Sequence, residues 1–256
     1  MTGTVHVSTP AHGVVLLELD NPPVNAMSAA MLEITHGTLT RVQSDDAVRA
    51  IVLTGRGRAF CTGADLKEAA ADHAGPSGRR RTSGFGAVFR DISTSRAPVI
   101  GAINGLCIGG GLELALCCDI RIASTAARFT GAGVNMGLMA SSYRLPRLIG
   151  VSRAKAMLLT GLPHDAATAE RWGLVTALHE PDDLLPEAIR LAARVASRAP
   201  LSVEATKRTI DRALDLSPTD ADAMAVDELT VLVASNDHRE AVAAFAAKRP
   251  PDFTRS

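Results

Sequence analysis

The sequence predicts an α/β core followed by a helical tail. Up to Leu178, short apolar and β-branched runs alternate with stretches of helical periodicity, a pattern typical of α/β domains. From Asp182 onward only helical segments follow, and they are interrupted at Pro200 and Pro218. We therefore expect a core in residues 1–181 and a helical region in residues 182–256 that forms a lid or an oligomer contact.

The composition narrows the function classes. The 256 residues are 46% apolar and 3% aromatic, which suits a packed core built from small side chains. Lys and Arg number 27, equal to Asp and Glu, whereas a nucleic-acid-binding protein usually carries a basic excess. No apolar run is long enough to span a membrane, and the first 13 residues lack the pattern of a signal peptide. We expect a cytoplasmic protein that binds neither nucleic acid nor membrane.

The cysteines and histidines do not predict a metal site. Cys61, Cys107, Cys117 and Cys118 form no CxxC pair and stand in apolar surroundings, so we expect buried thiols in a reducing compartment. The seven histidines are scattered without HxxxH spacing.

The local pattern assigns most elements in order. Strands are expected at residues 4–8, 14–20, 50–53, 98–103, 119–123 and 173–178. Helices are expected after the N-cap Ser28 and at residues 64–71, 85–94, 112–118, 142–149, 152–159 and 166–172. Residues 72–84, with three glycines and Arg79-Arg80-Arg81, are expected to form a mobile surface loop, and residues 129–141 an irregular segment.

The stretch 98–122 has the layout of a ligand-binding turn. An apolar strand is followed by Gly105 and by three consecutive glycines at 109–111, and then by a helix that carries Glu113 on its first turn. The first turn of a helix leaves N–H groups free and adds partial positive charge, and glycines let a ligand approach the backbone. This layout predicts a site for a developing oxyanion, with Glu113 as acid or base.

A second glycine turn lies at residues 58–66, after the strand AIVLTG and before a helix. Glycines at a strand end are usually only turns, but two such turns facing one site would give two N–H donors to one oxygen, which is an oxyanion hole. The sequence contains no GxGxxG fingerprint of a dinucleotide site, no Walker A lysine of a phosphate-binding loop and no GxSxG elbow of a serine hydrolase. A nucleotide-binding oxidoreductase is therefore disfavoured.

Together, AFCTGADLKE (59–68) and NGLCIGGGLELALCCDIRIA (104–123) resemble the enoyl-CoA hydratase/isomerase (crotonase) superfamily. Supporting similarity runs along the chain, in NPPVNAMS (21–28), LPRLIG (145–150), AERWGLV (169–175) and REAVAAFAAKRPPDF (239–253). The resemblance implies a crotonase (ClpP-like) spiral of ββα units with a C-terminal helical region, assembled as a trimer or a dimer of trimers.

The resemblance also implies roles for individual residues. Backbone N–H groups of Ala64 and Gly110 would polarise the thioester carbonyl of an acyl-CoA, and Glu113 would be the catalytic glutamate. Coenzyme A is then part of the substrate, and no permanently bound cofactor is implied. The positions expected to bind it are Cys61, Thr62, Asp65 and Leu66 in the same chain, and Phe245 and Lys248 from a neighbouring subunit. Arg79 to Arg81 either meet the CoA phosphates or, as is more usual for a charge run, face solvent.

One departure from the family pattern affects the predicted reaction. The second glutamate of the hydratases falls on Gly133, and the following segment is three residues shorter and lacks a PGAGG turn. Ser141, Ser142 and Tyr143 either enter the pocket or cap and pack the next helix, which is the more common role. We expect an enzyme that forms a thioester enolate with one glutamate, favouring isomerisation or related chemistry over standard hydration. The alternative is an acyl-CoA-binding protein with little turnover.

Overall fold

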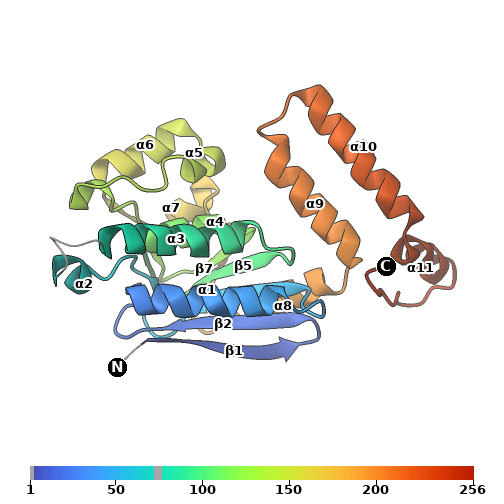
Figure 1. Cartoon of the computed structure of the whole chain (residues 1–256), viewed down its shortest axis with the longest axis horizontal. Coiled ribbons are helices and arrows are strands. Elements are labelled where there is room, and N and C mark those ends of the chain that lie inside the picture. Colours follow the sequence, from blue (N-terminus) through green and yellow to red (C-terminus); the bar gives the residue numbers. More distant parts are fainter. Residues whose placement is uncertain (1–2, 72–76) are drawn as a thin grey trace.

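The computed structural model describes residues 3–71 and 77–256. A larger and a smaller sheet form the core with helices packed around them, and the last three helices project from one end as an arm (Figure 1). The predicted α/β class with a helical C-terminal region is confirmed.

The larger sheet has six strands in the order β1-β2-β3-β5-β7-β10. Its first two strands pair antiparallel as a hairpin, and the remaining pairs are parallel. The central strands β3 and β5 are buried along their whole length because helices cover both faces, which explains their continuous apolar sequences. The strands of this sheet are β1 (Thr4–Ala11), β2 (Val14–Asp20), β3 (Ala50–Gly55), β5 (Val99–Ile103), β7 (Ile120–Ser124) and β10 (Leu178–His179).

The smaller sheet repeats the order of the larger one. Its strands are β4 (Ala59–Cys61), β6 (Leu106–Ile108), β8 (Arg128–Thr130) and β9 (Pro163–Asp165). Each of β4, β6 and β8 follows a strand of the larger sheet after a short turn; β4 pairs parallel with β6 and β6 with β8, while β9 pairs antiparallel with β8. Successive passes of the chain therefore place one strand in each sheet, and this stacking is the spiral of ββα units.

Helices fill the two sides of the larger sheet. The main core lies between the sheets and under α1 and α3, with Leu53, Phe60 and Phe129 among its buried residues. On the opposite face, α8 buries Ala188 and Ala192 against the sheet. The core helices are α1 (Ala29–Gln43), α2 (Leu66–Ala71), α3 (Ser77–Ser93), α4 (Gly110–Cys117), α5 (Arg144–Ile149), α6 (Val151–Thr160), α7 (Ala166–Trp172) and α8 (Leu184–Ala196), with a 3-10 turn at Val134–Met136.

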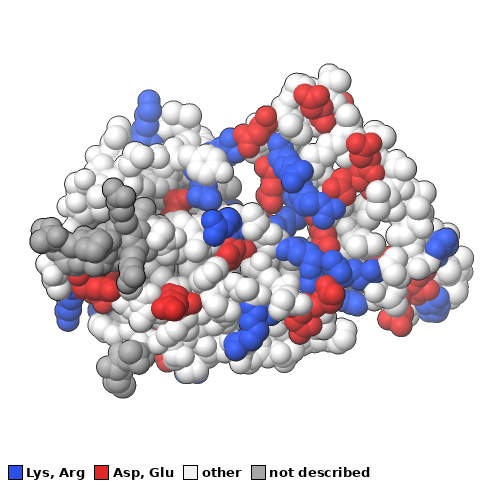
Figure 2. All heavy atoms as spheres, in the orientation of Figure 1, with Lys and Arg blue, Asp and Glu red and all other residues white. Residues whose placement is uncertain are grey.

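The C-terminal arm consists of α9 (Pro200–Ala213), α10 (Pro218–Ala234) and α11 (Asn236–Ala246). Glu204 of α9 is 7% exposed and accepts hydrogen bonds from Arg96 of the core and Arg255 of the C-terminus, both at 2.9 Å. Lys207 donates to Asp119 at 2.5 Å. Figure 2 shows Lys and Arg intermingled with Asp and Glu over this junction, so the arm is attached to the core through paired charges.

Most predicted elements are present, but the strand predicted at residues 173–178 is wrong before Leu178, because turns precede β10. Ser28 accepts the Met31 N–H and caps α1 (3.1 Å), and both Pro200 and Pro218 begin helices. The loop predicted at 72–84 is wrong from Ser77 onward, because α3 begins there and its arginine-rich sequence favours a helix. Residues 72–76 and the side chains of the arginine run lie outside the described residues. The strands β4, β6 and β9 have only three residues each, which is too short to show the alternation of apolar and polar residues that predicts a strand.

The division predicted at residue 182 stays a prediction. It assigns α8 to the helical region, while in the structure α8 packs on the sheet and α9 to α11 form the arm. Within residues 3–71 and 77–256, none of the helices combines the length and apolarity needed to cross a bilayer.

One buried side chain ties the turn after β2 to the smaller sheet. Asn25 is 1% exposed and has φ +53°, and its amide donates to the carbonyls of Ala59 (2.7 Å) and Arg56 (3.0 Å). Its Oδ1 accepts the Asn21 N–H at 2.9 Å. Asn25 therefore satisfies backbone groups on both sides of the turn that leads into β4.

We expect Asn25→Ala to lower the free energy of unfolding by about 2–4 kcal/mol, because buried carbonyls lose their donor and alanine disfavours a positive φ. Denaturant titration measures the change. Asn25→Gly separates the two causes, since glycine accepts this φ but makes no side-chain bond. A change below about 1 kcal/mol in both variants would contradict the assigned role.

Candidate active site

The two glycine turns predicted from the sequence touch each other. Gly63 ends the turn after β4 with φ +81°, and a Cβ added there would lie 2.6 Å from the Gly110 nitrogen. A Cβ on Gly111 would lie 1.9 Å from the carbonyl oxygen of Cys61. These contacts are tighter than any side chain allows, so only glycine at 63 and 111 lets the first turn of α4 approach the β4 turn.

The turns leave two backbone donors on the same side. Met27 donates to the Gly63 carbonyl (2.7 Å), and its own carbonyl accepts the Asp65 N–H (3.2 Å). Backbone groups of successive extended residues point to opposite sides, so the Ala64 N–H points away from Met27. Gly110 follows β6 as the first residue of α4, where the N–H has no helical acceptor. The predicted donors are thus neighbours in space.

Glu113 lies one turn further along α4. It is 7% exposed, and its Oε1 accepts a hydrogen bond from Nη1 of Arg144 on α5 at 2.5 Å. Its Oε2 is buried and has no hydrogen-bond partner among the described residues. A buried carboxylate oxygen is normally satisfied, so this atom is available to a ligand.

The guanidinium of Arg144 is positively charged at neutral pH. Burial lowers its pKa, but Cys117 and the hydrogen bond with Glu113 outweigh burial and hold the pKa above its usual range. Burial also raises the pKa of the Cys117 thiol to about 11, so this thiol is neutral near pH 7. Glu113 is therefore the partner that matters for Arg144 at neutral pH.

The segment around Gly133 has no room for a side chain. A Cβ on Gly133 would lie 2.9 Å from the Leu138 carbonyl oxygen and 3.1 Å from the Ala140 nitrogen. The preceding residue, Ala132, has its Cβ 4.0 Å from where a Cβ of Gly109 would be. The short segment after Gly133 thus folds onto that residue, directly beside the glycine turn of α4.

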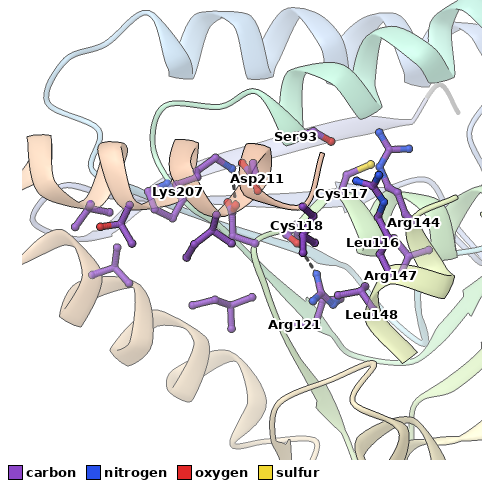
Figure 3. Close-up of a pocket in the computed structure, with 18 of the residues that line it drawn as sticks. Ser93, Leu116, Cys117, Cys118, Arg121, Arg144, Arg147, Leu148, Lys207 and Asp211 are labelled. Atoms are coloured by element: carbon purple, nitrogen blue, oxygen red, sulfur yellow. Dashed lines mark hydrogen bonds and ion pairs between the residues drawn. The ribbon is translucent and has the colours of Figure 1, made fainter. Parts of the chain in front are cut away.

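A cavity of about 830 Å³ opens beyond Arg144, between the core and α9 (Figure 3). Apolar residues such as Leu116, Leu148 and Ile210 line it together with charged side chains from both sides. Arg144 lines this cavity as well as contacting Glu113, so the cavity begins where the carboxylate site ends.

The residues predicted to bind CoA are not all together. Thr62 donates to the Val24 carbonyl (3.1 Å), Asp65 accepts N–H bonds from the first turn of α2, and Leu66 is exposed. Cys61 is fully buried, and burial raises the pKa of its thiol to about 12. Its backbone belongs to β4, which pairs with β6, and its carbonyl oxygen packs against Gly111.

Phe245 and Lys248 belong to the C-terminal arm. Both are exposed at α11, which lies at the end of the arm away from α4 in the same chain (Figure 1). A single chain therefore does not bring them to Ala64, Gly110 and Glu113.

The model of the enoyl-CoA hydratase/isomerase family matches residues 9–256. The chain belongs to the enoyl-CoA hydratase/isomerase family. It is 39% identical over 263 residues to the probable enoyl-CoA hydratase EchA12 of Mycobacterium tuberculosis, covering 98% of this chain and 92% of that protein. It is 34% identical over 246 residues to the crotonyl-CoA hydratase of Syntrophomonas wolfei, covering 94% of each.

The fold is that of the crotonase superfamily. The crystal structure of an enoyl-CoA hydratase from Bacillus anthracis superposes with a TM-score of 0.96 at 32% identity, covering 99% of this chain and all of that one. The resemblance inferred from the two glycine turns is thereby confirmed, and this chain is an enzyme of the enoyl-CoA hydratase/isomerase family.

Two neighbours of the candidate site were missed from the sequence. Arg144 lies 31 residues from Glu113, and nothing in its local pattern indicates an ion pair. The ring of Phe85 on α3 lies over the first residue of α4, since a Cβ on Gly110 would be 2.9 Å from its Cε1. Both contacts depend on how distant elements pack. The segment LPRLIG (145–150) resembles the family, but it begins one residue after Arg144 and so does not include it.

We expect Arg144→Met to lower the free energy of unfolding by about 1–3 kcal/mol, because it leaves the buried Glu113 carboxylate without a counter-charge. The double variant with Glu113→Gln should lose less than the sum of the single variants, by about 1–2 kcal/mol. Denaturant titration of all four proteins gives this coupling. Arg147→Met is the control, because its partner Asp215 is exposed; additive losses at 144 and 113 would contradict the pairing.

Proposed function

We propose that this enzyme acts on enoyl thioesters of coenzyme A through an enolate, with Glu113 as its single catalytic carboxylate. The observation that carries the proposal is the contact between Gly63 and Gly110, which puts two backbone donors beside a buried carboxylate oxygen. The relative from Syntrophomonas wolfei is named for the hydration of crotonyl-CoA, which supports a short or medium enoyl-CoA as the first substrate to test.

In the proposed reaction the thioester oxygen accepts hydrogen bonds from the Ala64 and Gly110 N–H groups. These donors stabilise the negative charge that develops when a proton leaves C2 of a 3-enoyl group or when water attacks C3 of a 2-enoyl group. Through Oε2, Glu113 takes the C2 proton in isomerisation and returns it to C4, or takes a proton from the attacking water in hydration and returns it to C2. The carboxylate is regenerated in each case, so no other acid is consumed.

Gly133 is the reason to favour chemistry that needs one carboxylate. We propose that it stands where two-glutamate hydratases carry their second acid, and the backbone packed against it excludes a side chain. Isomerisation needs one group to move one proton, whereas hydration also needs the water to be oriented. The alternative is a protein that binds acyl-CoA with little turnover, and the hydrogen bond from Arg144 to Glu113 would favour it by occupying the carboxylate. Arg144 bonds only to Oε1, however, and Oε2 has no partner among the described residues.

We further propose that CoA lies along the turn from Cys61 to Leu66 and that the acyl tail extends past Arg144 into the cavity beside α9. The proposal for the turn is supported by its exposure, since Thr62 and Asp65 are partly exposed and Leu66 is 54% exposed. The cavity is largely apolar and, at about 830 Å³, has the size of a small-molecule site.

We expect Glu113→Gln to lower kcat for enoyl-CoA isomerisation by about 10²- to 10⁴-fold, because an amide cannot carry the proton. Purified protein is assayed with crotonyl-CoA and with 3-enoyl-CoAs of increasing chain length. Glu170→Gln, an exposed glutamate on α7, is the matched control and should keep full activity. Full activity of Glu113→Gln would remove the assigned role. Tight binding of acyl-CoA by the wild type without turnover would support the binding-only alternative.

We also propose that the arm mediates assembly into a trimer or a dimer of trimers, in which Phe245 and Lys248 reach the CoA of a neighbouring subunit. Large apolar side chains are exposed along α9 and α10, including Leu214, Val226 and Leu229, and the ring of Phe245 is 87% exposed. Contiguous exposed apolar surface of this kind marks an interaction site.

Light scattering after gel filtration should give a mass three or six times that of the 26.7 kDa chain. Phe245→Ser should raise KM for acyl-CoA about tenfold with little change in kcat, as expected when a buried aromatic contact is lost. A monomeric mass, or an unchanged KM in a trimer, would exclude the proposed contribution from the neighbouring subunit.

A further inference from the structure

Three buried side-chain polar atoms have no hydrogen-bond partner in the part of the chain that the structure describes: Ser93 Oγ, Glu113 Oε2 and Ser141 Oγ. Ser93 lies beside the Cys117 thiol at the cavity wall (Figure 3), and Glu113 already has a role in the proposed function. The hydroxyl of Ser141 is unexplained. This residue is 6% exposed, so solvent does not satisfy the hydroxyl either.

Ser141 also has a strained backbone. Its φ is +59°, in the left-handed region that residues with a Cβ adopt at a cost and that glycine adopts freely. Serine therefore combines two unfavourable features at one position, a buried unpaired hydroxyl and a left-handed conformation. Such outliers concentrate at ligand and catalytic sites, where a bound molecule makes up for them.

The position of Ser141 connects the two parts of the candidate site. The preceding residue, Ala140, has its nitrogen 3.1 Å from where a Cβ of Gly133 would be. The carbonyl of Ser141 accepts the Leu145 N–H at 3.2 Å, and this bond begins the helical turn from which Arg144 reaches Glu113. Along the chain, Ser141 thus connects the segment packed on Gly133 with the helix that carries Arg144, the partner of Glu113.

We propose that Ser141 is a catalytic residue that holds the water added in hydration. This inference rests on the proposed enoyl-CoA function of the same site. One hydrogen of the water is donated to Ser141 Oγ, and the other faces Oε2 of Glu113. As the water oxygen bonds to C3, Glu113 takes the second hydrogen as a proton, and the C2–C3 π electrons move onto the thioester oxygen as an enolate. Glu113 then returns that proton to C2.

The balance of this step is one water added and no net change in either side chain. A serine hydroxyl accepts and donates hydrogen bonds but does not ionise near neutral pH, so Ser141 orients the water without moving the proton. Its hydrogen bond remains with the added oxygen, which becomes the 3-hydroxyl of the product. Ser141 therefore supplies the orienting half of what a second carboxylate would do, while Glu113 carries all proton transfer.

The test compares Ser141→Ala and Ser141→Gly with Ser142→Ala, an exposed neighbour. Hydration of crotonyl-CoA is measured alongside exchange of the C2 hydrogens of butyryl-CoA in D2O, which needs Glu113 and the oxyanion donors but no added water. Thermal unfolding is recorded for each protein. We expect both Ser141 variants to lose about 10- to 100-fold in kcat for hydration, the effect of one hydrogen bond made in the transition state. C2 exchange should stay within about twofold.

The two substitutions separate function from structure, because glycine relieves the backbone strain that alanine keeps. We expect Ser141→Gly to unfold at a temperature equal to or above that of Ser141→Ala. The role of Ser141 would be overturned if the rates of hydration and of C2 exchange fell together in the variants. It would also be overturned if the hydration rate tracked the unfolding temperature of each variant instead of the presence of the hydroxyl. A wild type that exchanges C2 hydrogens but does not hydrate also overturns it and leaves the enolate function standing. A wild type active in neither assay would instead reject the proposed function itself.

Discussion

The rest of this site depends on the contact between two glycine turns. Gly63 and Gly110 approach so closely that a single added methyl group would collide with the backbone of the facing turn. The approach is fixed from outside by the two sheets, because β4 pairs with β6 and the strands before them, β3 and β5, pair in the larger sheet. Backbone donors placed in this way need no reorganisation when charge develops on a bound oxygen, which is the condition for effective electrostatic stabilisation.

The same contact explains why Glu113 is buried. Because α4 begins at the glycine turn, its first turn is enclosed by the turn after β4, by the ring of Phe85 and by α5. A carboxylate in such a place needs a partner, and Arg144 provides it from α5 for one oxygen only. The ion pair fixes the orientation of the side chain and leaves Oε2 unpaired. The position thus serves two needs that usually conflict, stability of a buried charge and availability of an acceptor.

The sequence patterns predicted local features such as helix caps and turns, and they missed contacts that depend on how distant elements pack. The cap at Ser28, the prolines that begin α9 and α10, and both strand–turn–helix units follow from residue types at fixed spacing. The facing of the two turns was raised as a possibility from their shared layout and gained support from the family resemblance, because no local pattern reports that β4 lies beside β6. Arg144 was out of reach for the same reason, and Ser141 was named only as a residue that either enters the pocket or packs the next helix. The assignment of Arg144 depends on a contact 31 residues away, and that of Ser141 on a positive φ in a residue that rarely has one. The loop predicted at residues 72–84 from its glycines and its arginine run was wrong from Ser77 onward, because α3 begins there.

Gly133 is packed tightly against the segment that follows it. The Leu138 carbonyl and the Ala140 nitrogen lie against Gly133, within the space that any side chain there would occupy. The Leu138 N–H also donates to the Gly133 carbonyl at 2.9 Å, so the close packing is held by a hydrogen bond. A glutamate introduced at 133 would displace this segment instead of restoring a second acid. The same segment leads into Ser141, so a change in its length would also move that hydroxyl. The backbone path of residues 133–141 therefore decides both which side chain fits at position 133 and where Ser141 lies.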